Sequence, residues 1–171
     1  IKRLEKNAYV KGVKVIRKFP NKLIIDIDSR IQVAAIVYGE EYVVIDGDGV
    51  VLRKTDVEPH ITLLKGLTIS KLNVGNPVEA EESIALTNIL KMLKAMEKGN
   101  IYFKKIVINK IIIKAYIYDN LICKGTPKQL LYSINSGKLQ KVINKLFEDD
   151  ITRGTMTFSG NNYISFSPVV D

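Results

Sequence analysis

Two aspartates and two glycines alternate at Asp46–Gly49, and this stretch restricts the local fold most strongly. The segments on either side, EEYVVI before it and VVLRK after it, have the β-branched composition of strands. Glycine adopts positive φ without steric cost, so Asp-Gly between two such runs is a strong hairpin signal. The sequence therefore predicts two antiparallel strands joined by a tight turn at Asp46–Gly49.

A calcium loop and a phosphate-binding loop are the alternatives for the same four residues. An EF-hand loop beginning at Asp46 needs an oxygen ligand at its fifth position and a glutamate at its twelfth. Val50 and Val57 stand at those positions. A phosphate loop would lead into a helix, whereas VVLRK is typical of a strand. The turn interpretation is therefore favoured over both kinds of site.

Alternating apolar residues predict further strands along the chain. We expect a helix end at 3–10 and a hairpin at 12–30 with its turn at Pro20–Asn21. Residues 55–77 have few regular signals and are interpreted as a loop. The other predicted strands lie at 31–39, 40–46, 49–54, 101–109, 111–119 and 121–125, and a last hairpin spans 154–168 around residues 160–162.

Helical spacing of apolar residues predicts two helical regions. The first spans 79–98, with Glu79, Glu81 and Glu82 in its first turns, where the helix dipole favours anions. The second begins at Thr126-Pro127, can form a capping box with Gln129, and is broken near 135–137. Sequential strands, short turns and these helices predict an α+β fold with a mostly antiparallel sheet and packed helices.

The chain is basic, with 26 Lys and Arg against 18 Asp and Glu, a net charge of +8. Such a charge suits nucleic acid, anionic lipid or anionic wall polymers as ligands. Arginine is scarce, tryptophan is absent, and the aromatic residues are not interleaved with arginine, which disfavours nucleic-acid binding.

Residues that carry chemistry are few. Cys123 lies in an apolar run and is predicted to be a buried small hydrophobe. His60 is the only histidine, and it follows Pro59 in a loop, where it is a poor metal ligand. No nucleophile or phosphate motif is evident. We therefore expect no enzyme activity, no cofactor and no metal, and favour a binding or scaffold module.

Four stretches, in order, resemble the extracytoplasmic part of the bacterial cell-division family FtsQ/DivIB. They are NAYVKGVKVIRKFPNKLIIDIDSRIQVAAI, YVVIDGDGVVL, GTPKQLLYSINSGKLQKVINKLF and GTMTFSGNNYISFSP. The resemblance implies that residues 1–30 are the last helix end and hairpin of a POTRA domain, and that residues 31–171 are the family's β domain. Two departures occur: residues 29–32 read SRIQ where the family has Glu-Arg-x-Pro, and residues 156–158 lack the family's acid and arginine.

The resemblance implies a non-enzymatic divisome scaffold that binds FtsB/DivIC-type and FtsL-type partners by β-strand addition. Carried over by position, the partner-binding residues are Phe158, Gly160, Tyr163, Ser165 and Phe166, with Phe158 and Phe166 alternatively plain core residues. The implied location is the cell membrane at the septum, with this domain outside. The resemblance also implies a single membrane helix upstream, and the start at Ile1 instead of Met is expected of a piece cut from a longer protein.

Two other functions remain open, together with a further ligand. An envelope assembly or chaperone module with POTRA domains would share the hairpin, but residues 79–168 do not repeat residues 1–30. A basic nucleic-acid-binding protein would show binding that falls linearly with the logarithm of salt concentration. The basic charge also suggests anionic cell-wall polymers as a ligand.

Overall fold

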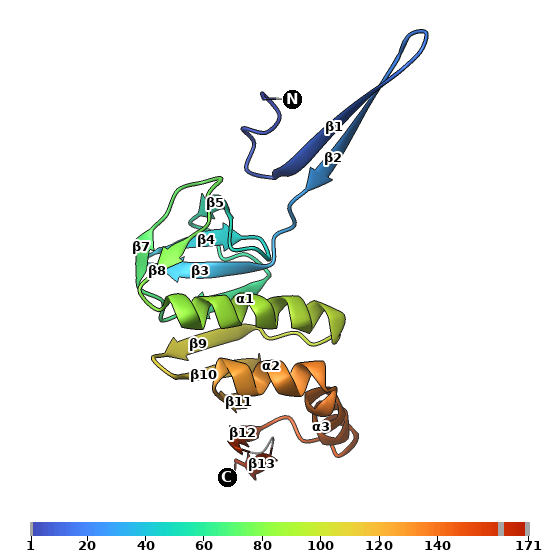
Figure 1. The fold of residues 1–171 in the computed structure, drawn as a ribbon. Coiled ribbons are helices and arrows are strands. Elements are labelled where there is room, and N and C mark those ends of the chain that lie inside the picture. The colour runs from blue at the N-terminus through green and yellow to red at the C-terminus, as the bar shows by residue number, and fades with distance from the viewer. Residues whose placement is uncertain (1, 161–162, 170–171) are drawn as a thin grey trace.

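The computed structural model describes residues 2–160 and 163–169. Within those ranges the chain forms a nine-stranded sheet, two two-stranded sheets and three helices (Figure 1). Five of the eight strand pairings in the large sheet are antiparallel. The predicted α+β class with a mostly antiparallel sheet and packed helices is confirmed.

The first hairpin is separate from the large sheet. Strands β1 (Val10–Lys18) and β2 (Lys22–Ser29) pair with each other, and the hairpin projects away from the sheet in Figure 1. Its predicted turn is confirmed, because Lys18 pairs with Lys22 across it. The helix end expected at 3–10 was wrong: residues 2–9 form turns. So short a segment, with its apolar Leu4 exposed, has no packed face to stabilise a helix.

The large sheet has the strand order β13-β12-β11-β10-β9-β6-β3-β4-β5. The predicted β4–β5 turn is confirmed, with Gly49 at φ 81° and its N–H donating to the Asp46 carbonyl at 3.1 Å. The strands are β3 (Ala34–Tyr38), β4 (Glu41–Ile45), β5 (Val51–Thr55), β6 (Thr62–Lys65), β9 (Lys105–Asn109), β10 (Ile112–Tyr118), β11 (Leu121–Gly125), β12 (Gly154–Ser159) and β13 (Tyr163–Pro168).

The loop predicted for residues 55–77 was wrong at its centre. Strand β6 lies in the middle of the large sheet, parallel to both β3 and β9. Its first three residues are buried on both faces, with Leu64 in the main core and Leu63 in a second small cluster, and only Lys65 at its end is exposed. A strand buried on both faces has no polar alternation to detect. Beyond it, β7 (Ile69–Lys71) and β8 (Glu79–Ala80) form a short separate pair.

The helices are α1 (Ser83–Lys98), α2 (Pro127–Asn135) and α3 (Lys138–Glu148). The break near 135–137 and the capping box between Thr126 and Gln129 are confirmed. Helix α1 starts later than predicted, because Glu79 belongs to β8, so the three glutamates precede the helix. Glu82 instead accepts hydrogen bonds from the Thr68 N–H at 2.8 Å and the Thr68 hydroxyl at 2.9 Å.

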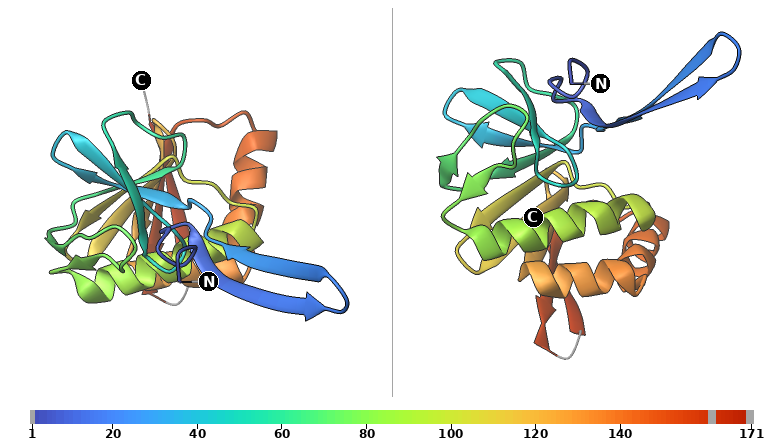
Figure 2. Two further views of the ribbon diagram at one scale, coloured as in Figure 1. Left: turned by 90° about the horizontal axis from the view of Figure 1, so that it is seen from above. Right: turned by 45° about the horizontal axis from the view of Figure 1, so that its top comes forward.

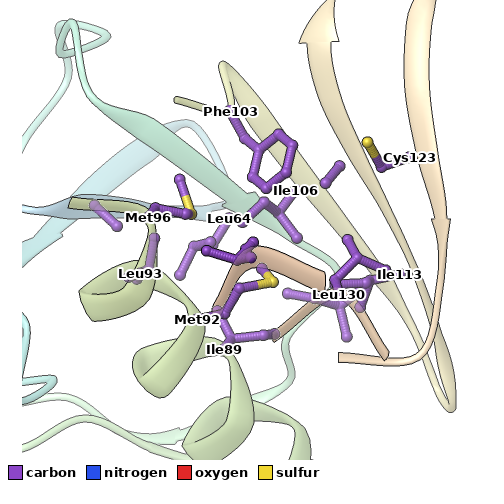
Figure 3. Packing of buried hydrophobic residues seen from close by; sticks show 14 of the residues in the cluster. Leu64, Ile89, Met92, Leu93, Met96, Phe103, Ile106, Ile113, Cys123 and Leu130 are labelled. Atoms are coloured by element: carbon purple, nitrogen blue, oxygen red, sulfur yellow. The ribbon is translucent and has the colours of Figure 1, made fainter. Parts of the chain in front are cut away.

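The main core lies between the helices and one face of the sheet. Figure 3 shows Ile89 and Met92 of α1 directed toward Leu64 and Ile106 of the sheet. Cys123 is fully buried there, as predicted, and burial raises the pKa of its thiol. On the opposite face, the second cluster covers only the half of the sheet near β3, β4 and β6. No helix in the described ranges has both the length and the apolar character of a membrane span.

Candidate functional site: the open edge at β13

The two edges of the large sheet differ in how far they are covered. At the β5 edge, Val51 donates its N–H to the Asn76 carbonyl at 2.9 Å and accepts from the Gly75 N–H at 2.8 Å. The isolated bridge between Val50 and Pro77 continues this cover. At the other edge, β13 pairs with β12 and with no other strand in the described part of the chain. The β12–β13 hairpin is the red element at the lower end of Figure 2, right.

The register fixes which backbone groups of β13 point outward. The Gly154 N–H donates to the Asn120 carbonyl at 2.8 Å, on the β11 side. Because backbone direction alternates along a strand, Thr155 and Thr157 direct their N–H and C=O groups toward β13. Ser167 and Ser165 are their paired residues.

The residues between these paired positions have the opposite backbone direction. Ile164 and Phe166 therefore direct their N–H and C=O groups away from β12, into the open edge. Unpaired groups of this kind are the template that an added strand uses. The edge that the sequence analysis singled out therefore carries unpaired backbone groups at Ile164 and Phe166.

The side chains of the closing hairpin divide between two faces, as the alternation of residues 163–167 predicts. Phe158 is 5% exposed and belongs to the main core, and Ile164 and Phe166 pack against that core. By the same alternation the backbone groups of Phe158 face the β11 side, so a contact between Phe158 and a partner would need a rearranged core. The Phe166 ring packs on the core, while its backbone N–H and C=O groups point away from β12 into the open edge.

Gly154 makes room for the Phe166 ring. It has φ 146°, and a Cβ at this position would overlap the ring and approach the Ser167 carbonyl oxygen to 2.8 Å. A glycine is therefore needed where the ring crosses β12. The ring in turn anchors the edge strand to the sheet.

The remaining predicted contact residues lie on the outer face or at the hairpin end. Tyr163 is 66% exposed, and Ser165 is half-buried with its hydroxyl 3.5 Å from the Thr157 carbonyl. Gly160 is exposed, with no atom within 4 Å of an added Cβ. Residues 161 and 162 of the predicted turn lie outside the described residues. All five predicted residues thus come from one hairpin, but only Tyr163 presents a large exposed side chain.

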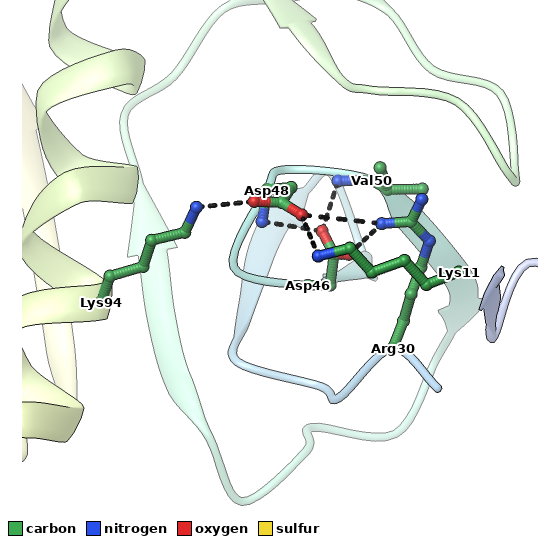
Figure 4. A network of polar contacts seen from close by, with 6 residues as sticks. All are labelled: Lys11, Arg30, Asp46, Asp48, Val50 and Lys94. Atoms are coloured by element: carbon green, nitrogen blue, oxygen red, sulfur yellow. Dashed lines mark hydrogen bonds and ion pairs between the residues drawn. The ribbon is translucent and has the colours of Figure 1, made fainter. Parts of the chain in front are cut away.

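A second polar site lies at the β4–β5 turn, and the sequence analysis missed it. Its members, the turn cluster, are Lys11, Arg30, Asp46, Asp48 and Lys94 (Figure 4). The carboxylate of Asp46 accepts from Arg30 Nη1 at 2.6 Å and from the N–H groups of Asp48 at 2.9 Å and Val50 at 2.8 Å. Asp46 is 4% exposed, so the turn is closed around a paired, buried acid.

Asp48 joins three parts of the chain. Its carboxylate pairs with Lys94 of α1 at 2.6 Å and with Lys11 of β1 at 3.1 Å. Hydrogen bonds from Lys94 and then Lys11 lower the pKa of Asp48 from 3.8 to about 2. The turn cluster therefore fastens the projecting hairpin and helix α1 to the sheet. The available sequence signal for this cluster was Asp48. Asp46 alone closes the turn, so a second aspartate indicated a further contact.

The described residues contain no group of three His, Cys, Asp or Glu side chains placed to hold a metal ion. The two aspartates of the turn cluster are instead engaged by lysine, arginine and backbone N–H groups. In the turn cluster the charged side chains pair with one another. At the β13 edge the outward backbone groups have no partner strand in the described part of the chain.

Comparison with known proteins confirms the resemblance found in the sequence. The chain is 29% identical over 170 residues to the cell division protein DivIB of Clostridium tetani, covering 91% of this chain and 61% of that protein. It is 24% identical over 159 residues to DivIB of Clostridium acetobutylicum, covering 91% and 63%. The chain therefore spans less than two thirds of the length of these relatives. No protein-family model matches the chain.

A solved structure is also similar to the chain. It is the major extracytoplasmic domain of the trans isomer of DivIB from Geobacillus stearothermophilus, at TM-score 0.44 and 12% identity. The match covers 73% of this chain and 99% of that one.

Proposed function

We propose that this chain is the extracytoplasmic part of a cell-division protein that acts as a non-enzymatic scaffold. Its partners are small division proteins of the FtsB/DivIC and FtsL types, which add a strand to β13. The relatives that match more than nine tenths of the chain are named as cell division proteins, which supports the process. A membrane helix upstream and a POTRA domain ending in the β1–β2 hairpin complete the proposed architecture.

The open edge of β13 is the observation that carries this proposal. The outward N–H and C=O groups of Ile164 and Phe166 give an added strand four backbone hydrogen-bonding groups in register. Each hydrogen bond formed contributes about 1 kcal/mol net. That sum alone is small, so side-chain contacts must supply specificity, and Tyr163 is the exposed aromatic residue in place to do so.

The rest of the hairpin favours binding without rearrangement. Ile164 and Phe166 already pack on the core, so the edge strand is held in place before a partner arrives. A preorganised edge avoids the entropy of ordering a strand during association. The covered β5 edge does not compete for the added strand at Val51.

Amide hydrogen exchange in the presence of a DivIC-type peptide tests this function. In the free protein, the N–H of Ser165 is bonded to β12 and should exchange slowly, while those of Ile164 and Phe166 should exchange faster. On binding, the Ile164 and Phe166 amides should become protected and the Ser165 amide should change little. Binding that protects other elements and leaves these two amides unchanged would reject strand addition at β13.

A further inference from the structure

An exposed apolar tip lies at the end of the molecule where the β9–β10 turn meets the starts of α1 and α2. Ile84 at the start of α1 is 77% exposed, Ile111 in the turn is 75% exposed, and Ile112 is 43% exposed. Ile84, Ile111 and Pro127 line a hollow of about 550 Å³. These elements end at the left of Figure 1. We call this region the β9–β10 tip.

Lysines surround the β9–β10 tip. Lys110 and Lys128 line its hollow. On the sheet face without helices, Lys65, Lys114 and Lys124 follow one row across the strands, since Lys65 pairs with Val107, Val107 with Lys114, and Lys114 with Lys124. The row lies two residues along β10 from Ile112. Exposed isoleucines and a basic row are therefore adjacent.

The three lysines of the row and the two that line the hollow have no acidic partners to balance their charge. In the described part of the chain, none of the five lysines has a carboxylate within 4.0 Å. Lys114 and Lys124 are direct cross-strand partners, an arrangement that destabilises a sheet. Two acids line the hollow, Glu81 and Glu82, so the five lysines outnumber the nearby carboxylates. An anionic ligand would relieve this repulsion.

The combination of lysine with exposed isoleucine identifies the anion. Lysine is depleted from protein interfaces, whereas it binds phosphate well as a point charge. A soluble phosphate polymer would use the lysines but gains nothing from Ile84 and Ile111 at their centre. An anionic lipid surface uses both, because lysines contact headgroup phosphates while apolar side chains enter the acyl boundary.

We propose that the β9–β10 tip docks on an anionic phospholipid surface, with Ile84, Ile111 and Ile112 inserted and the five lysines on the phosphates. This surface uses different residues from the β13 edge, so it stands or falls independently of strand addition. The lipid contact would set how the sheet is oriented against a membrane.

Vesicle binding by the 171-residue chain tests the charge requirement. The chain should sediment with vesicles of equal parts phosphatidylglycerol and phosphatidylcholine, and not with phosphatidylcholine alone. Lys114→Glu/Lys124→Glu should weaken binding by about 25-fold or more, since each lysine near such a surface contributes about a 5-fold factor. The matched control is Lys141→Glu/Lys145→Glu on α3, at the other end of the helix layer in Figure 1, which makes the same charge change. An equal loss for both pairs would overturn the proposal.

Insertion of the tip separates a lipid from a soluble polyanion. The chain contains no tryptophan, so Ile111→Trp introduces a single reporter at the tip. Its emission should shift to the blue with phosphatidylglycerol vesicles, and Ile111→Asn should weaken vesicle binding. No blue shift would overturn the proposal, as would inorganic polyphosphate binding as tightly as the vesicles without dependence on residue 111. Folding of each variant is checked by its thermal unfolding midpoint.

Discussion

Lys94 on helix α1 and Asp48 in the β4–β5 turn form an ion pair of 2.6 Å across 46 residues of sequence. The same carboxylate pairs with Lys11 of the projecting hairpin at 3.1 Å. Within the described residues, these contacts and the neighbouring Arg30–Asp46 pair are the ion pairs that hold hairpin, helix and sheet together. The β4–β5 turn is therefore a structural joint, meaning the point where ion pairs connect the hairpin, helix α1 and the sheet.

Protonation of Asp48 should weaken this joint at low pH. Its folded-state pKa of about 2 lies below the ordinary 3.8, so the stabilisation is present above about pH 4 and is lost as the pH falls toward 2. The side chain is 40% exposed, so solvent screening reduces the effect. The free energy of unfolding of the natural chain should fall more steeply in this window than that of Asp48→Asn.

Asp26→Asn is the matched control for this titration, because it removes one exposed acid from β2 outside the joint. It should retain the full acid-dependent loss that the natural chain shows. An unchanged slope in Asp48→Asn would mean that the Lys94 and Lys11 pairs contribute nothing measurable.

Removal of Arg30 should destabilise the chain strongly. Asp46 is buried, and Arg30→Ala would leave its carboxylate with backbone N–H donors but without a cation. Breaking one partner of a buried pair costs about 3 kcal/mol in the free energy of unfolding. Urea unfolding measures this, and Arg30→Ala/Asp46→Asn should lose less than the sum of the single variants. Strict additivity would argue against direct coupling of the two side chains.

Gly154 should be intolerant of any side chain. Gly154→Ala places a Cβ against the Phe166 ring at φ 146°, which should cost about 2 kcal/mol or more and displace the edge strand. Gly160→Ala, in the same hairpin, has open space around its Cβ and should cost little. Thermal unfolding of both variants compares them directly. Equal stability would contradict the anchoring role of Phe166.

Local signals predicted the elements whose causes are local. The Asp46–Gly49 turn, the capping box at Thr126 and the helix break near 136 each depend on a few adjacent residues, and each is confirmed. Strand β6 was not predicted, because burial on both faces removes the polar alternation that indicates a strand. The predicted start of α1 at residue 79 was too early, because Glu79 pairs with β7.

The candidate sites depend on long-range pairing, which explains what the sequence could and could not predict. Alternation along residues 163–167 predicted the two faces of β13 but not which backbone groups are free. That depends on the parallel pairing of β12 with β11. The turn cluster joins residues separated by 16, 37 and 46 positions, with no local pattern to link them. The register also decides where proline can test the edge: the Tyr163 N–H faces β12, whereas the Ile164 N–H faces the open edge.

The most direct test of strand addition compares Ile164→Pro with Ile164→Ala in binding a DivIC-type peptide, measured by calorimetry. Both variants lose packing of the isoleucine side chain, but only proline removes the outward N–H while leaving the β12 ladder intact. Partner affinity should fall by about 5-fold or more for Ile164→Pro relative to Ile164→Ala, the equivalent of about one lost backbone hydrogen bond. Equal affinities of two folded variants would contradict strand addition at β13.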